Sequence, residues 1–362
     1  MTRLLVSVLL FMAIMMPHSA LAKEEAAPIM LVVKSSSDAV HQTELEIRSS
    51  LVNRALQNIK PIQKVREIPF STRSILVDQG YRVQAFSIDE RGYLYDPSTM
   101  TKYQFEKEEI WKKLSTFFTG LEEEHFGELM EWEEVDKLIP RYTSFTISDL
   151  ETGLSFRGQR RAGANHADVQ PLTLEDTKIM KEIYGGKWSW ARRAILIQHD
   201  GREIAASMHG MPHGGGALAN GFPGHFCIHF AGSVTHKTKN LDLSHQVMIH
   251  KAAGLVVPFV KQQTPENIVH LLATAYNHND SDLAKLIHIP KTDIRTEELK
   301  QIEIMRITKE HTPSLDNLLY REIPFTYRLS ERGKKERELT TTFRLQRESP
   351  LSEWRMIRTA IN

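Results

Sequence analysis

The most informative run of this chain reads Gly224-His225-Phe226-Cys227-Ile228-His229-Phe230, and a second run just upstream reads Met208-His209-Gly210-Met211-Pro212-His213-Gly214. Together they hold the only cysteine among four histidines. A thiol is a strong nucleophile near neutral pH only when a base takes its proton, and histidine is the usual base. Backbone N–H groups in a tight Gly-rich turn can hold a developing oxyanion. The two runs therefore indicate a Cys–His site for acyl transfer.

The surrounding composition concentrates histidine around this thiol. The 362-residue chain has 16 histidines, and eight of them fall within residues 199–250. A single cysteine can form no intrachain disulfide, and no Cys-rich zinc motif can be built from it. Cys227 is therefore either a buried, inert side chain or a working thiol.

The two runs resemble the catalytic motif of L,D-transpeptidases. That motif has a His-Gly, a loop, and then Ser/Thr-His-Gly-Cys followed by a hydrophobic residue and Arg or Asn. His209-Gly210 matches the first part, and Cys227 follows His209 by 18 residues. His225 and Ile228 match the positions around the cysteine. Three positions depart from the motif, namely Gly224 for Ser/Thr, Phe226 for Gly and His229 for Arg/Asn.

The departures bear on the chemistry of the site. The family's glycine makes a tight turn beside the thiolate, and Phe226 does not readily take a positive φ. His229 is charged only part of the time, so it would hold a substrate carboxylate less firmly than arginine. Residues 143–254, about a third of the chain, also resemble exported proteins of Bacilli and Clostridia, on Asp-Leu-Glu-Thr-Gly, His-Ala-Asp-Val, Trp-Ser-Trp and Gly-His-Phe-Cys-Ile-His-Phe.

The resemblance implies an exported cysteine acyltransferase that acts on peptidoglycan stem peptides. Cys227 would accept an acyl group from a tetrapeptide donor and pass it to an amine, giving a 3→3 crosslink, or to water. His209 is the expected base by its position, His213 is its rival, and His225 would shape the site. No cofactor is implied. Further candidates for substrate binding are Gly210, Gly224, Phe226, His229, Trp190, Arg193, His166 and Asp168.

Two other classes of function stay open. His166-Ala167-Asp168 has the spacing of a metal-ligating pair, and with His225 it could hold zinc in a cell-wall peptidase. The other alternative is a non-catalytic wall-binding protein that keeps the fold with a degenerate site. Trp188-Ser189-Trp190-Ala191-Arg192-Arg193 could hold a glycan or a peptide carboxylate, or could simply anchor the core.

The N-terminus predicts export. Arg3 precedes an apolar run from Leu4 to Met16, and Ala20-Leu21-Ala22 offers small residues for cleavage, so residues 1–22 are expected to be a signal peptide. The mature protein would work in the cell envelope or be secreted, with no transmembrane domain after cleavage. Lys and Arg number 46 against 45 acids, and this balance gives no basic excess for a nucleic-acid partner.

Hydrophobic patterning predicts an α+β protein with several domains. An N-terminal α+β region is expected over residues 23–141, with a helical lead-in over 23–60. A mostly β catalytic domain like that of L,D-transpeptidases is expected over 142–257. It would contain strands near 143–147, 154–157, 194–198 and 203–208, and helices over 173–184 and 243–253. After a linker from Pro258, residues 262–362 would form an α+β domain resembling nuclear transport factor 2.

Overall fold

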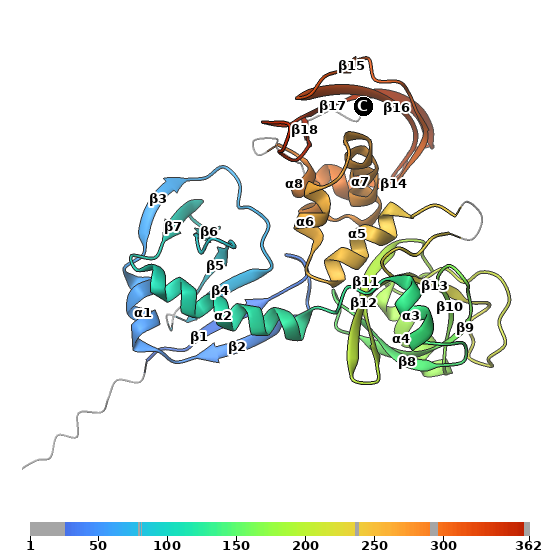
Figure 1. Cartoon of the computed structure of the whole chain (residues 1–362), viewed down its shortest axis with the longest axis horizontal. Coiled ribbons are helices and arrows are strands. Elements are labelled where there is room, and N and C mark those ends of the chain that lie inside the picture. The colour runs from blue at the N-terminus through green and yellow to red at the C-terminus, as the bar shows by residue number, and fades with distance from the viewer. Residues whose placement is uncertain (1–25, 79, 81, 236–238, 290–295, 358–362) are drawn as a thin grey trace, which may run out of the picture.

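A computed structural model describes residues 26–78, 80, 82–235, 239–289 and 296–357. The protein is α+β, as expected, and strands predominate; they form three separate sheets (Figure 1). The expected signal peptide, residues 1–22, lies outside the described residues. None of the helices in the described part of the chain is both long enough and apolar enough to cross a membrane.

The first sheet is a seven-stranded antiparallel sheet in the order β2-β1-β4-β5-β6-β7-β3. Its strands are β1 (Ile29–Val33), β2 (Thr43–Ile47), β3 (Lys60–Lys64), β4 (Arg73–Asp78), β5 (Val83–Ile88), β6 (Leu94–Asp96) and β7 (Thr101–Gln104). Helix α2 (Glu108–His125) packs on it, and α1 (Ser50–Gln57) precedes β3. The predicted helical lead-in is therefore wrong over β1 and β2, and right only for α1.

The second sheet is a closed six-stranded barrel in the order β10-β13-β12-β11-β8-β9. Its strands are β8 (Ser144–Asp149), β9 (Ser155–Ala162), β10 (Ala167–Pro171), β11 (Arg192–His199), β12 (Arg202–His209) and β13 (Phe226–His229). Successive side chains on a strand point to opposite faces. One set, including Val169, Ile195, Met208 and Phe226, fills a common apolar core, so the alternate residues face outward.

Helices complete the barrel. α3 (Trp132–Leu138) and α4 (Leu174–Ile183) contribute side chains to its core. The predicted helix over 173–184 is confirmed, and Thr173 and Asp176 form a capping box at its start. The predicted helix over 243–253 is also confirmed as α5 (Leu243–Ala252), which packs on the outward faces of β11 and β12.

The C-terminal part holds α7 (Pro265–His278) in the hollow of a curved sheet (Figure 1). The strands are β14 (Ile302–Glu310), β15 (Leu315–Asp316), β16 (Tyr320–Glu331), β17 (Arg337–Gln346) and β18 (Arg355–Ile357). Helices α8 (Ser281–Ile287) and α9 (Thr296–Gln301) precede them. The linker predicted from Pro258 is wrong, because Pro258 lies inside α6 (Val256–Lys261), whose short length tolerates it.

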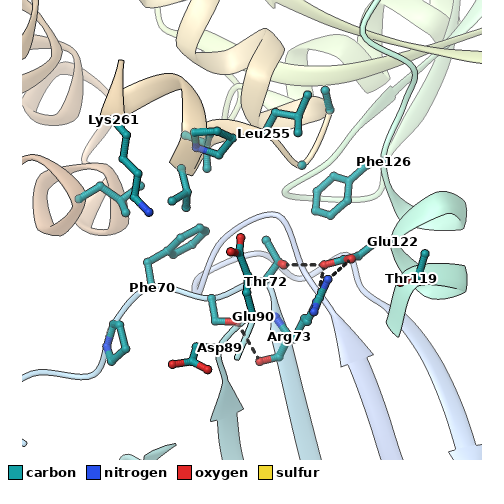
Figure 2. Close-up of a pocket in the computed structure, with 18 of the residues that line it drawn as sticks. Phe70, Thr72, Arg73, Asp89, Glu90, Thr119, Glu122, Phe126, Leu255 and Lys261 are labelled. Atoms are coloured by element: carbon teal, nitrogen blue, oxygen red, sulfur yellow. Dashed lines mark hydrogen bonds and ion pairs between the residues drawn. The ribbon is translucent and has the colours of Figure 1, made fainter. Parts of the chain in front are cut away.

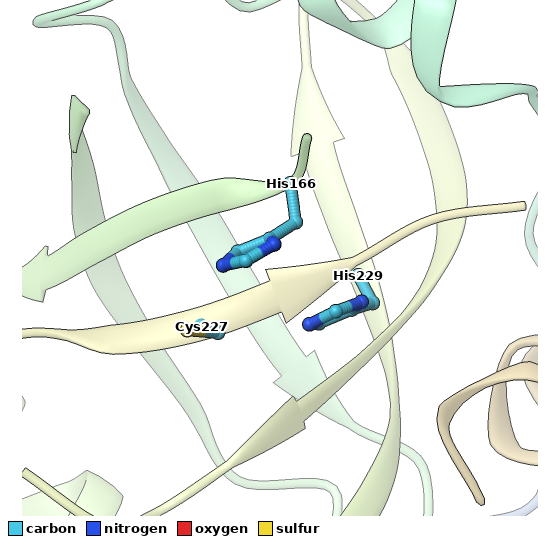
Figure 3. A group of neighbouring side chains, drawn as sticks. All are labelled: His166, Cys227 and His229. Atoms are coloured by element: carbon cyan, nitrogen blue, oxygen red, sulfur yellow. The ribbon is translucent and has the colours of Figure 1, made fainter. Parts of the chain in front are cut away.

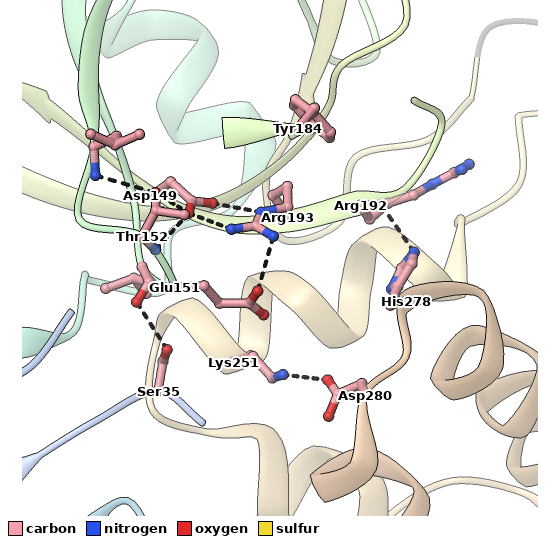
Figure 4. A network of polar contacts seen from close by, with 12 residues as sticks. Ser35, Asp149, Glu151, Thr152, Tyr184, Arg192, Arg193, Lys251, His278 and Asp280 are labelled. Carbon is pink, nitrogen blue, oxygen red and sulfur yellow. Dashed lines mark hydrogen bonds and ion pairs between the residues drawn. The ribbon is translucent and has the colours of Figure 1, made fainter. Parts of the chain in front are cut away.

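Helix α5 joins the barrel to the rest of the molecule. Its apolar residues belong to one continuous core that also includes β1, α2, α7 and β16. Figure 4 shows the polar contacts at this junction. Lys251 of α5 forms a buried ion pair with Asp280. The backbone N–H of Arg192 in β11 donates a hydrogen bond to His278 Nε2 at 3.0 Å. On its other side, α5 lies against the outward face of β12 and β13, which together with β10 form a wall that carries the polar residues of the candidate site.

Candidate functional site

The outward face of the barrel wall gathers the polar residues that the sequence singled out. Asp168 of β10 lies directly opposite Cys227 of β13, and Ser207 of β12 lies opposite His229. Because side chains alternate, His166, Asp168, Cys227, His229, Ser207 and His209 all project from this one face. The outward wall therefore carries adjacent imidazole, thiol and carboxylate side chains, from β10 across β13 to β12.

The thiol of Cys227 contacts one imidazole and one carboxylate. Its Sγ lies 3.4 Å from His213 Nε2 and 3.9 Å from Asp168 Oδ1. His213 Nδ1 lies 3.1 Å from the carbonyl oxygen of Met211, to which it donates, so Nε2 is left as an acceptor for the thiol proton. The geometry is that required of a nucleophile, a base and a group that orients the base.

His209, the base expected from its position, lies beside His213 and makes no hydrogen bond to the thiol among the contacts of the described residues. Its ring centroid is 5.2 Å from that of His213, and its Nδ1 accepts the backbone N–H of Met211 at 3.3 Å. The half-exposed ring of Trp190 lies over both histidines, at 4.7 and 5.5 Å. Trp190 therefore forms the rim of the site, as a substrate-binding residue would.

The site is closed over the thiol. Cys227 is only 6% exposed. His213 and His225 exchange two backbone hydrogen bonds, of 3.0 and 2.9 Å, and their rings are 4.5 Å apart. Gly214 has φ +61°, and a Cβ there would lie 2.4 Å from the His225 ring. Only glycine allows the loop to fold this closely over the wall.

Burial sets the protonation of the wall. It raises the pKa of the Cys227 thiol, and the Asp168 carboxylate raises it further. It also lowers the pKa of His213, although the hydrogen bond to Met211 opposes this shift. The pKa of His229 falls to about 3, because burial and the neighbouring His166 both disfavour the protonated form of the ring. The resting site thus holds a neutral thiol beside a neutral imidazole, in place of the thiolate expected from the sequence.

Four other candidate residues have different surroundings. Phe226 points into the barrel core, and because it lies in a regular strand it needs no positive φ. Gly224, with φ +125°, makes the tight turn instead. Gly210 gives room to the ring of Tyr184, which a Cβ would meet at 2.5 Å. Arg193 forms ion pairs with Asp149 and Glu151 (Figure 4), so its charge is already paired within the protein.

The alternative zinc ligands do come together. Asp168 Oδ1 lies 3.4 Å from His166 Nε2 and 3.8 Å from His225 Nε2. Two other groups have three ligand atoms within 4.8 Å of one another, and both contain the thiol: His166, Cys227 and His229, and His209, His213 and Cys227. The wall can therefore offer a metal nitrogen, sulfur and oxygen ligands.

Three further residues belong to this site. His245 of α5 stacks on His229 at 4.0 Å, and its Nδ1 is 2.9 Å from Ser207 Oγ. Asp242 caps α5 and pairs with Arg192 at 2.7 Å. None of the three is among the site residues expected from the sequence. The alternation Ser207-x-His209 on one strand was the available sign that both share a face.

The cavity of about 1060 Å³ in Figure 2 lies elsewhere. It is bounded by the first sheet, the end of α2, and α6, with Phe70, Arg73, Glu122 and Lys261 among its lining residues. Arg73 and Glu122 pair across it at 2.6 Å. Cys227 and the wall histidines do not line it, so its size has no bearing on the thiol chemistry.

Replacing Asp168 by asparagine should lower the pKa of the Cys227 thiol. A carboxylate this close to a thiol disfavours the thiolate by about one pKa unit or more, so removing its charge should speed alkylation near pH 8 about tenfold. The measurement is the rate of iodoacetamide reaction in the presence of a chelator. Asp200→Asn, in the exposed turn between β11 and β12, is the control. An unchanged rate in Asp168→Asn would contradict the role given to this carboxylate.

No family model matches the chain, and no curated protein matches it. What the site does must therefore be argued from its geometry and from the motif resemblance.

Proposed function

We propose that this chain is an exported cysteine acyltransferase that acts on peptidoglycan stem peptides. The observation that carries the proposal is the 3.4 Å contact between Cys227 Sγ and His213 Nε2, with His213 oriented by the Met211 carbonyl. A buried cysteine with only a packing role needs no oriented base. The motif resemblance to L,D-transpeptidases supports the substrate class.

In this proposal His213 is the base, and the role of His209 is to position it. Burial holds the pKa of His209 well below its usual value, and its Nδ1 already accepts the Met211 N–H. That contact fixes the backbone whose carbonyl orients His213. The 18-residue spacing between His209 and Cys227 is then the length of chain that brings the loop of residues 210–224, with His213, over the thiol.

The reaction begins from a neutral pair. His213 Nε2 takes the thiol proton as Sγ bonds to the carbonyl carbon of the donor stem peptide. Collapse of the tetrahedral intermediate breaks the peptide bond and expels the amine, which receives the proton from His213. An acceptor amine, or water, then attacks the thioester and regenerates the thiol. Burial lowers the pKa of His213, and the Asp168 carboxylate, 3.9 Å from Sγ, partly opposes that shift and so favours the transient imidazolium.

Substrate access requires the loop of residues 210–224 to separate from the wall. The paired backbones of His213 and His225 cover the thiol in the closed state. Breaking the pair would also free the N–H of His225, which now donates to the His213 carbonyl. Opening would therefore supply one of the oxyanion donors expected near residues 225–227.

The test is mass spectrometry of the protein after incubation with a disaccharide-tetrapeptide in the presence of a chelator. We expect the peptide that contains Cys227 to gain the acyl mass, with release of the donor's terminal amino acid. The matched control donor is a disaccharide-pentapeptide, whose terminal peptide bond joins two D-residues, and it should leave the thiol free. A folded protein whose thiol stays unmodified with every tetrapeptide donor would refute the proposal and favour a non-catalytic wall-binding role.

A further inference from the structure

We propose that the barrel wall binds one divalent ion of the zinc class through Cys227, His229, His166 and Asp168, and that the bound ion switches the thiol off. The four residues form two i, i+2 pairs on adjacent antiparallel strands. Asp168 is the register partner of Cys227, and the ring of His166, one residue before β10, stacks on the ring of His229 at 4.4 Å. Figure 3 shows the two imidazoles lying parallel, with the thiol beside them.

The ligand atoms are close to tetrahedral spacing. Zinc bonds of about 2.0–2.3 Å at tetrahedral angles place ligand atoms about 3.5 Å apart. Asp168 Oδ1 lies 3.4 Å from His166 Nε2 and 3.9 Å from Cys227 Sγ. The ligand atoms of His166, Cys227 and His229 lie within 4.8 Å of one another. Side-chain shifts of about 1 Å would close the set around an ion.

The histidines are prepared as ligands. His229 is 3% exposed, and its Nδ1 is a buried atom with no hydrogen-bond partner among the residues that the structure describes. Stacking on His166 at 4.4 Å and on His245 at 4.0 Å holds the His229 ring in place beside the thiol. His166 Nδ1 lies 3.0 Å from the carbonyl of Val234, an outer contact that orients a ligating imidazole and directs Nε2 toward the thiol.

Charge also fits a divalent cation. A thiolate and a carboxylate together carry two negative charges, so a divalent ion would leave the buried set neutral. Binding would release the thiol proton to the solvent, and the sulfur lone pair would form the metal bond. A set of two nitrogens, one sulfur and one oxygen suits zinc better than calcium or magnesium, which prefer oxygen alone.

The second group around the thiol is less suitable. His213 uses Nδ1 on the Met211 carbonyl and Nε2 on the thiol, and His209 Nδ1 accepts the Met211 N–H. His213 also lies on the loop that must open for substrate, whereas the proposed ligands lie on or beside paired strands. The quartet can therefore hold an ion whether the loop is closed or open.

The consequence for activity rests on the proposed function. A sulfur that is bonded to metal cannot attack a carbonyl, so zinc would hold the acyltransferase inactive until the ion is removed. Metal binding itself does not depend on any activity. The two parts of the inference can therefore fail separately.

The experiment titrates the purified, metal-free protein with Co²⁺ and follows the thiolate-to-cobalt absorption band, with Zn²⁺ as competitor. We expect one equivalent to bind, and Zn²⁺ to displace it and protect Cys227 from alkylation. Loss of even an outer contact costs about 10–100-fold in affinity, so His229→Phe and His166→Phe should each weaken binding about 100-fold or more. His250→Phe is the matched control, because His250 lies on the same helix as His245 but stacks on Phe259, outside the site.

Three outcomes separate the possibilities. Folded wild-type protein that gives no cobalt band overturns the inference, whatever the variants do. A band that His213→Gln or His250→Phe removes, but His229→Phe leaves, also overturns it by assigning the ion elsewhere. A band lost in His229→Phe and His166→Phe supports the metal site, even if metal-free protein transfers no acyl group; in that case only the proposed function and the switch fail.

Discussion

Replacing His213 by glutamine should slow acyl-enzyme formation about 10²–10⁴-fold, which is the usual contribution of a positioned base. Glutamine can still bond to the Met211 carbonyl, but it cannot take the thiol proton. His209→Gln should slow acyl-enzyme formation much less, because in the proposed function His209 only positions the loop that carries His213. Cys227→Ser should form no thioester at all. The measurement is the rate of acyl-enzyme formation by mass spectrometry, with circular dichroism to show that each variant is folded.

The pH profile gives this prediction a second readout. The base must be neutral to act, and burial lowers the pKa of His213 from 6.5. Activity should therefore persist through pH 6.5 and decline only at lower pH, as the imidazole becomes protonated. A larger loss in His209→Gln than in His213→Gln would reverse the assignment and restore the base that the motif spacing favoured.

Local structure was largely predictable from the sequence. Thr173, an N-cap residue followed by acidic residues, predicted the start of α4. Two short strand-like segments around the turn His199-Asp200-Gly201 predicted the hairpin of β11 and β12. Both depend on contacts between residues near in sequence. The lead-in failed because Leu45, Ile47 and Leu51 have helical spacing, although the first two lie in β2 and only the third lies in α1. A mixed strand and helix can imitate a single helix over a short window.

The arrangement of the wall was not predictable in this way. Asp168 and Cys227 are 59 residues apart, and no local pattern specifies that they pair. Once β10 and β13 are adjacent, however, His-x-Asp and Cys-x-His must share a face. The sequence placed Cys227 and His229 in the acyl-transfer site. It offered His166 and Asp168 both as substrate-binding residues of that site and as ligands of an alternative zinc site. The direct opposition of the two pairs follows only from barrel closure.

The base that we propose could not be chosen from the sequence, because the choice rests on a loop. His209 ends a strand and His213 lies four residues later, and both satisfy the requirement for a histidine upstream of the thiol. The proposal of His213 rests on the Met211 carbonyl, which orients His213, and on the backbone pairing of His213 with His225. Irregular backbone contacts of this kind leave no periodic signal in a sequence.

The buried imidazoles should make the fold sensitive to acid. Burial lowers the pKa of His125 to about 4, and those of His229 and His278 to about 3. In the unfolded chain each would titrate near 6.5. Below pH 6.5 the unfolded state therefore binds more protons than the folded state, so stability falls as the pH falls. Between pH 7 and pH 5 each residue should cost about 2 kcal/mol, and the three together about 6 kcal/mol.

Such a loss is comparable with the whole stability of many domains, about 5–15 kcal/mol. Urea unfolding at pH 7, 6 and 5, with a chelator present, should show the midpoint falling steeply. His229→Phe should flatten the slope by about one proton, because phenylalanine keeps the stacked ring and removes the titrating group. His199→Phe, at the end of β11 and away from the wall, should keep the wild-type slope. A midpoint that stays constant down to pH 5 would mean that the wall accepts protons while folded, and that its histidines are not held neutral by burial.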